Sequence, residues 1–163
     1  EMQILDYNRV VKDLNGLTED QLLASIESNF LLTYNPYPLA PDSPHIYSMF
    51  LNKKWYRLKA KEHIISDDPV EGLDASILQN YLLAPILDID DPRTNKRIDF
   101  VGGIRGLEEL ERRCSLDAKV AFALYPVSIE DLLSVADARK VMPPKSTWFE
   151  PKLRSGLVVR LLS

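Results

Sequence analysis

Six cationic, hydroxyl and amide side chains near the two ends of the chain could hold a phosphate group: Lys145, Ser146, Thr147, Lys152, Asn8 and Arg9. Lysine supplies a point charge, and the hydroxyls supply hydrogen-bond donors. This is the equipment that phosphoryl transfer uses to position its substrate. The sequence therefore predicts a candidate anion site made by the C-terminal segment, with a contribution from the first predicted strand.

The segment around Lys145 is not a P-loop. Lys-Ser is the end of such a motif, but no G-x-x-x-x-G precedes it, and Pro143 and Pro144 lack the amide donors that would hold phosphate. A structural alternative is a proline-stiffened turn in which Trp148 and Phe149 pack and the lysines are solvated. The residues alone leave both interpretations open.

Positive charge is concentrated at the C-terminal end. Residues 139–160 hold six basic side chains and one acidic one, a net charge of +5, whereas the whole chain carries −4 and the remainder therefore −9. Such asymmetry suits an anionic ligand or an acidic neighbouring surface. Nucleic acid is the third and least favoured partner, because the overall charge is negative.

The other residues with reactive side chains favour structural roles. Cys114 falls on the apolar side of a predicted helix, which indicates a core thiol. His45 and His63 have no second histidine at metal-ligand spacing, which favours surface histidines and no metal site. The glycine-rich segment 102–106 between a strand and a helix favours a tight turn over a phosphate loop.

Periodicity in the first half predicts strands with one helix. Alternation over 2–11 predicts a strand, and residues 46–51 and 55–60 predict a hairpin. Thr18 and Gln21 form a capping-box pattern for a helix with an apolar face of Leu22, Leu23, Ile26 and Phe30. Phe30 also begins a predicted short strand over 30–33. Four prolines within 35–44 predict an extended loop.

The second half predicts alternating helices and strands. Asp74 is placed to cap a helix with the face Ile77, Leu78, Tyr81 and Leu82, which Pro85 ends or kinks. We expect strands at 98–101, 120–125 and 157–162. Between them, a helix over 107–114 would carry the i,i+4 pairs Glu108 with Arg112 and Glu109 with Arg113. Ser128 caps a helix over 129–138 with the stripe Ile129, Leu132, Leu133 and Ala136.

Composition indicates one α+β domain with a mixed β-sheet and about three to four helices packed on it. The 163 residues are 45% apolar and 27% charged, enough to bury a core. No apolar run approaches the length of a membrane helix, so we expect no membrane association. The chain opens on Glu1 inside an apolar alternation, which leads us to expect a fragment, residues 1–163, of a longer protein.

Three segments resemble a prokaryotic family catalogued as domain of unknown function 1015. They are residues 142–157 (MPPKSTWFEPKLRSGL), residues 7–11 (YNRVV), and Leu73-Asp74 with the helix that follows as far as Leu87. Glu150 departs from the family pattern, in which we expect an aromatic residue at this position. The resemblance implies that this chain is the C-terminal portion of the family's fold. The upstream half of the family's longer members, which this chain lacks, would be similar to the ParB-like and sulfiredoxin-like group. That group includes nucleotide-using enzymes and a free-serine kinase.

Two functions follow as expectations. The first is an accessory or interaction domain of a larger cytoplasmic bacterial protein, docked on the missing N-terminal half and not catalytically complete alone. The second is part of a phosphate- or nucleotide-binding enzyme, a phosphotransferase that could be serine-kinase-like and would take a nucleotide or phosphorylated small molecule. No cofactor is evident in this chain, and we expect ATP or ADP to bind only to the full-length protein.

Overall fold

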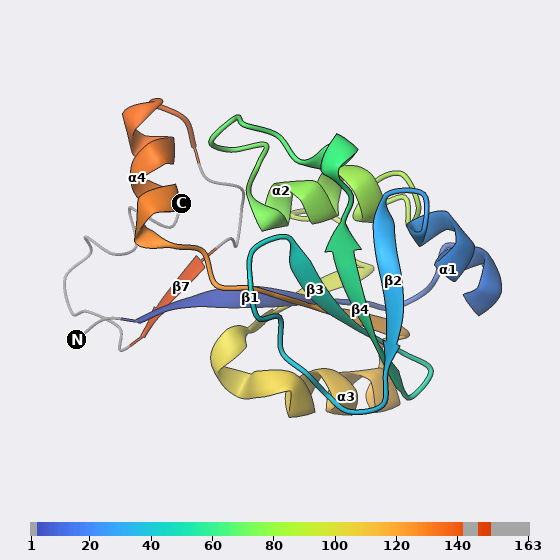
Figure 1. Cartoon of the computed structure of the whole chain (residues 1–163). Helices are drawn as coiled ribbons and strands as arrows, with labels where there is room; N and C mark the ends of the chain where they lie inside the picture. The colour runs from blue at the N-terminus through green and yellow to red at the C-terminus, as the bar shows by residue number, and fades with distance from the viewer. Residues whose placement is uncertain (1–2, 142–146, 151–163) are drawn as a thin grey trace.

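One antiparallel sheet organises the chain (Figure 1). A computed structural model describes residues 3–141 and 147–150. The strand order is β2 (Phe30–Asn35), β4 (Lys54–Ala60), β3 (Ile46–Leu51), β6 (Val120–Leu124), β1 (Gln3–Val11) and β5 (Ile98–Gly102), and β7 (Thr147–Glu150) pairs with the start of β1. The α+β class is confirmed. The expected mixed sheet is corrected, because every pair of described strands is antiparallel.

Strand residues alternate between two cores on opposite faces of the sheet. Val11 and Phe122 belong to the larger core, together with side chains from the helices after β1 and β4. Val10 and Ala121, their neighbours along the chain, belong to the second core. This period of two is the signature of strands buried on both faces. The predicted strands over 2–11 and 120–125 and the predicted hairpin are confirmed.

Helix α1 (Glu19–Ile26) begins as its sequence predicts. The Thr18 side chain accepts a hydrogen bond from the Gln21 amide at 3.1 Å, and the Gln21 side chain accepts one from the Thr18 amide at 2.9 Å. Leu22 and Ile26 are buried in the larger core. Phe30 lies in β2 rather than on the helix, since α1 ends at Ile26.

Helix α2 (Asp74–Leu78) continues directly into a π-helical turn, Gln79–Leu83. The Ala84 amide donates to the Gln79 carbonyl at 2.9 Å, which is the wider i to i+5 spacing. The predicted cap is wrong: Leu73 holds the cap position, and the Asp74 carboxylate binds a different partner, described below. In the predicted face, Ile77, Leu78 and Leu82 are buried, whereas Tyr81 is exposed at the border.

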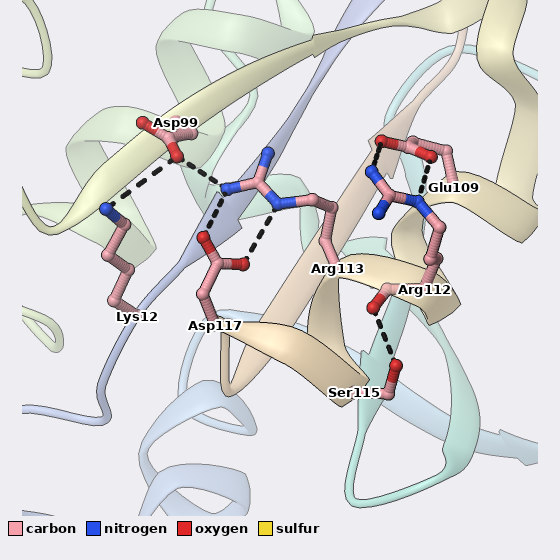
Figure 2. A network of polar contacts seen from close by, with 7 residues as sticks. All are labelled: Lys12, Asp99, Glu109, Arg112, Arg113, Ser115 and Asp117. Atoms are coloured by element: carbon pink, nitrogen blue, oxygen red, sulfur yellow. Dashed lines mark hydrogen bonds and ion pairs between the residues drawn. The ribbon is translucent and has the colours of Figure 1, made fainter.

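Helix α3 (Gly106–Leu116) covers the second core, and its ion pairs differ from the predicted ones (Figure 2). The Arg113 guanidinium contacts Asp117 at 3.0 Å and Asp99 on β5 at 2.5 Å. Arg112 pairs with Glu109 at i,i+3, at 2.7 Å. The i,i+4 prediction was wrong because Arg112 takes Glu109, three residues earlier, as its partner, and Arg113 turns instead to Asp117, four residues later, and to Asp99 on the sheet.

Helix α4 (Ile129–Asp137) begins at Ser128, whose side chain accepts from the Asp131 amide at 3.0 Å, as predicted. Of its predicted apolar stripe, Leu132 packs inward, whereas Ile129, Leu133 and Ala136 are exposed. Val135 is the buried residue and packs with Leu73, with Val70, Val127 and Leu132 partly buried around them. Ile129 and Leu133 are more than half exposed. Helix α4 is thus attached to the molecule through a small apolar cluster.

The remaining described segments are turns and loops. Short 3-10 helices occur at Glu62–Ile64 and Gly103–Arg105, the second within the predicted glycine-rich turn. Residues 36–44 form the expected extended loop. Within residues 3–141 and 147–150, none of the helices has the length and apolar character needed to cross a bilayer. The predicted strand over 157–162 lies outside the described residues.

Candidate functional site

A cleft of about 500 Å³ lies where four segments of the chain meet. One wall is formed by residues 44–45 and the start of α2, and the opposite wall by the first turns of α4. The loop 66–73 and the residues that follow β6 complete the lining. Gly72 is required in this loop, because a Cβ atom there would clash with the Ser66 carbonyl oxygen. The charged and titratable lining residues with short side chains are His45, Asp67, Asp68, Asp74 and Asp131, and Ser66, Ser128 and Ser134 add hydroxyl groups.

His45 and Asp74 form a close pair in this cleft. The His45 ring Nδ1 lies 3.0 Å from Asp74 Oδ1, and the His45 backbone amide donates to both carboxylate oxygens at 2.9 and 3.0 Å. The Asp74 side chain is 11% exposed and that of His45 31%. The Tyr47 hydroxyl, from buried β3, donates to the Asp74 backbone carbonyl at 2.7 Å. A buried strand and a helix N-terminus therefore hold the pair together.

The environment of His45 favours its protonated form. The hydrogen bond to Asp74 raises the pKa of His45 above its ordinary 6.5, against the lowering effect of burial, and the charge of Asp131 across the cleft adds to the rise. A carboxylate accepts hydrogen bonds only, so Nδ1 carries a proton in both charge states of the ring. In the neutral ring, Nε2 is then the basic nitrogen.

The other charged residues of the lining are Asp67, Asp68 and Asp131, all of them acidic. Asp68 accepts from the Glu71 amide at 2.8 Å, and it pairs with Lys140, which follows α4. These two interactions lower the pKa of Asp68 to about 2. Because carboxylates outnumber cations in the described lining, the cleft by itself suits a neutral or cationic group better than a phosphate.

Asn8 and Arg9, two of the predicted anion-site residues, are buried on β1, between β6 and β5. Asn8 Oδ1 accepts a hydrogen bond from the Leu124 amide at 3.1 Å, at the end of β6. Arg9 donates to the Tyr7 carbonyl and stacks over the Phe100 ring, 5.0 Å from its centroid. Arg9 also lines a second cavity of about 460 Å³ with Gln79, Asp90, Asp91 and Arg93.

The sheet brings the two predicted segments next to each other along the backbone. Thr147 on β7 pairs with Asp6 on β1, two residues before Asn8. Lys145, Ser146 and Lys152 lie outside the described residues. The anion site therefore remains a prediction. The pairing of β1 with β7 places the backbone of Thr147 close to that of Asn8 and Arg9.

Sequence reasoning missed the His45–Asp74 pair. The two residues are 29 positions apart, a separation that no local motif encodes. His45 was expected at the surface and is half-buried, whereas the other histidine, His63, is exposed and contacts Asn29. Cys114 packs at the second core as expected, and burial raises its pKa to about 11. The described residues contain no group of three or more His, Cys, Asp or Glu side chains able to hold a metal ion.

Residues 1–76 match the model of a family described as "Protein of unknown function (DUF1015)". This agrees with the resemblance found at Tyr7–Val11 and Leu73-Asp74. Curated proteins give no match to the chain.

Among solved structures, the fold is similar to free serine kinase in complex with AMP, at a TM-score of 0.54 and 9% identity. It is also similar to a mutant free serine kinase in complex with ADP, at a TM-score of 0.53 and 10% identity. In each case the match covers 91% of this chain and 54% of the other. The chain thus spans about half the length of these structures, and at this identity the likeness concerns the fold.

Proposed function

We propose that this chain is part of a nucleotide-dependent phosphotransferase whose acceptor is a small hydroxyl compound. The observation that carries the proposal is the cleft with the His45–Asp74 pair, placed on a fold shared over 91% of the chain with kinase structures that hold AMP and ADP. A half-buried histidine held by a carboxylate is an arrangement that moves protons in transfer reactions.

The described cleft and the anion site predicted from the sequence have complementary charge. The described cleft is acidic and would take the acceptor, for which free serine is the first probe because the similar structures are of a free serine kinase. The phosphates would be held by the basic C-terminal residues Lys145 and Lys152 with the hydroxyls of Ser146 and Thr147, as the sequence predicts.

The test is a thermal-shift and calorimetric titration of the full-length protein with ADP, ATP and AMP. A ligand present at about 100 times its dissociation constant stabilises the folded state by about 2.7 kcal/mol, which raises the melting temperature by several degrees. We expect Lys145→Ala and Lys152→Ala to weaken nucleotide binding with little change in the melting temperature of the free protein. The matched control is Lys96→Ala, which removes an exposed lysine outside the C-terminal segment.

An unchanged nucleotide affinity in both lysine variants would remove the C-terminal residues from the site. A protein that shows no binding of any nucleotide would overturn the proposed function.

A second candidate function is that of an interaction domain, which the exposed apolar residues at one edge of the sheet favour. β2 ends the strand order, and Leu31 and Tyr34 on it, with Tyr37 and Leu39 in the following loop, are each more than half exposed. Exposed edges of this kind accept a partner strand. Limited proteolysis of the full-length protein distinguishes the candidates, because a separable interaction domain is released as a folded piece.

A further inference from the structure

We propose that His45 is the proton acceptor for the acceptor hydroxyl, and that Asp74 is its positioning residue. The inference rests on the proposed function and assigns a step of that reaction to residues that neither the family model nor the similar structures identify.

Asp74 fixes the tautomer of the neutral His45 ring. Asp74 Oδ1 lies 3.0 Å from His45 Nδ1, so the carboxylate keeps the proton on Nδ1 and leaves the lone pair on Nε2. A histidine oriented by a carboxylate in this way is the general-base half of a catalytic triad. His45 lines the cleft, so its basic nitrogen, Nε2, is on a residue that an acceptor in the cleft could contact.

The backbone of His45 is held in an unusual conformation. His45 has a φ of 70°, in the left-handed region that side chains other than glycine rarely adopt. The Asp74 carboxylate accepts the His45 backbone amide with both oxygens, which holds this conformation and aligns the ring with the same carboxylate. Such strain at a non-glycine residue persists only where the surroundings fix it.

Two carboxylates act on the His45 ring, Asp74 on α2 and Asp131 on α4. Asp67 and Asp68, on the loop that precedes α2, line the same cleft, and Lys140 pairs with Asp68. The net negative surroundings strengthen the ring as a base at neutral pH. A general base is most effective when its pKa lies near the working pH.

The step balances as an in-line transfer. The acceptor hydroxyl oxygen forms a bond to the terminal phosphorus of the nucleotide, and the bond from that phosphorus to its bridging oxygen breaks. The shortened nucleotide leaves with the electron pair, and the hydroxyl proton moves to His45 Nε2. Asp74 stays ionised and stabilises the imidazolium that forms.

The left-handed backbone allows a precise test, because glycine fits this conformation without strain. The quantity to measure is phosphoryl transfer by the full-length protein, from ATP and from ADP, to L-serine, ethanolamine and glycerol. His45→Gly is expected to lower kcat by about 10²- to 10⁴-fold with nucleotide affinity unchanged. Added imidazole should then restore part of the rate, since the variant leaves a ring-sized space in the cleft.

The matched control is His63→Gln. His63 is the other histidine of the chain, it is exposed, and it contacts Asn29 away from the cleft lining. We expect this variant to keep the wild-type rate, and imidazole to have no effect on it.

A pH profile separates the proposed role from a structural one. The base must be unprotonated, so log kcat/KM of the wild type should rise with pH through the raised pKa of His45 and then level off. Asp74→Asn should lower kcat and shift this rise to lower pH, because the charge that favours the protonated ring is lost. A merely structural role would leave the position of the rise unchanged.

Each outcome decides the proposal. Loss of transfer in His45→Gly with rescue by imidazole supports it. Full transfer in His45→Gly overturns it and leaves the proposed function standing. A wild-type protein that binds nucleotide but phosphorylates none of the three acceptors overturns the proposed acceptor class and this inference with it. Absence of nucleotide binding overturns the proposed function and this inference together.

Discussion

Asp74 holds both the backbone and the ring of His45. Its carboxylate accepts hydrogen bonds from the backbone amide and from the ring Nδ1 of this histidine, and its own backbone carbonyl accepts one from the Tyr47 hydroxyl. A substitution at Asp74 therefore disturbs both the conformation and the chemistry of His45, whereas a substitution at His45 removes only the ring. For this reason His45 is the more informative position for mutation.

The raised pKa of His45 predicts a contribution to stability that depends on pH. The folded state binds the proton more tightly than the unfolded chain, so the stabilisation is complete below about pH 6.5 and is lost as the pH rises through the raised pKa. The pair is partly solvated, so we expect less than about 1 kcal/mol. Urea unfolding of wild type and His45→Gln at about pH 5 and about pH 8.5 measures it, and an equal difference at both pH values would contradict it.

At the scale of single elements, the attachment of α4 gives a sharp prediction. Val135 is 2% exposed and packs on Leu73, whereas Leu133 on the same helix is 57% exposed. Val135→Ala should lower the free energy of unfolding by about 1–2 kcal/mol. Leu133→Ala, the control, should change it by less than about 0.5 kcal/mol. The reverse order in chemical denaturation would restore the stripe predicted from sequence.

Elements whose signals are local were predictable from the sequence. The capping box at Thr18 and the Ser128 cap each depend on residues three positions apart, and the strands depend on alternation with a period of two. The predicted apolar stripe of α4 was mostly wrong because a helix with apolar residues on more than one side does not show which side meets a neighbour. The buried side of α4 is the one that contacts Leu73, a residue distant in sequence.

The candidate site was less predictable than the fold. Asp74 carries the sequence signal of a helix cap, and His45 carries none, so their pairing is visible only once β3 and α2 are brought together. For Asn8, the polar residue type was noticed, but its role in receiving the Leu124 amide depends on the neighbouring strand. Lys145, Ser146 and Lys152 stay predictions.

At the scale of the whole molecule, Arg113 connects helix α3 to the sheet. Its guanidinium contacts Asp117 and Asp99, and Asp99 also lies 3.9 Å from Lys12 (Figure 2). Lysine cannot hold two carboxylates in one plane, so Arg113→Lys should lower the melting temperature more than Arg112→Lys, which affects a pair with one carboxylate only.

Salt provides the check on this connection. Most of the carboxylates in the network are partly solvated, so the difference between the two variants should shrink in about 1 M sodium chloride, where the screening length is about 3 Å. A difference that does not change with salt would assign the effect of Arg113 to packing of its aliphatic stem.

The π-helical turn Gln79–Leu83 has a consequence for comparing this chain with its relatives. A π-helical turn accommodates one more residue than an α-helical turn of the same length along the axis. A relative with an uninterrupted α-helix would therefore be one residue shorter between Leu78 and Pro85. An alignment without a gap there would shift every later position by one, so that Arg97 and Arg113 would be compared with the wrong residues.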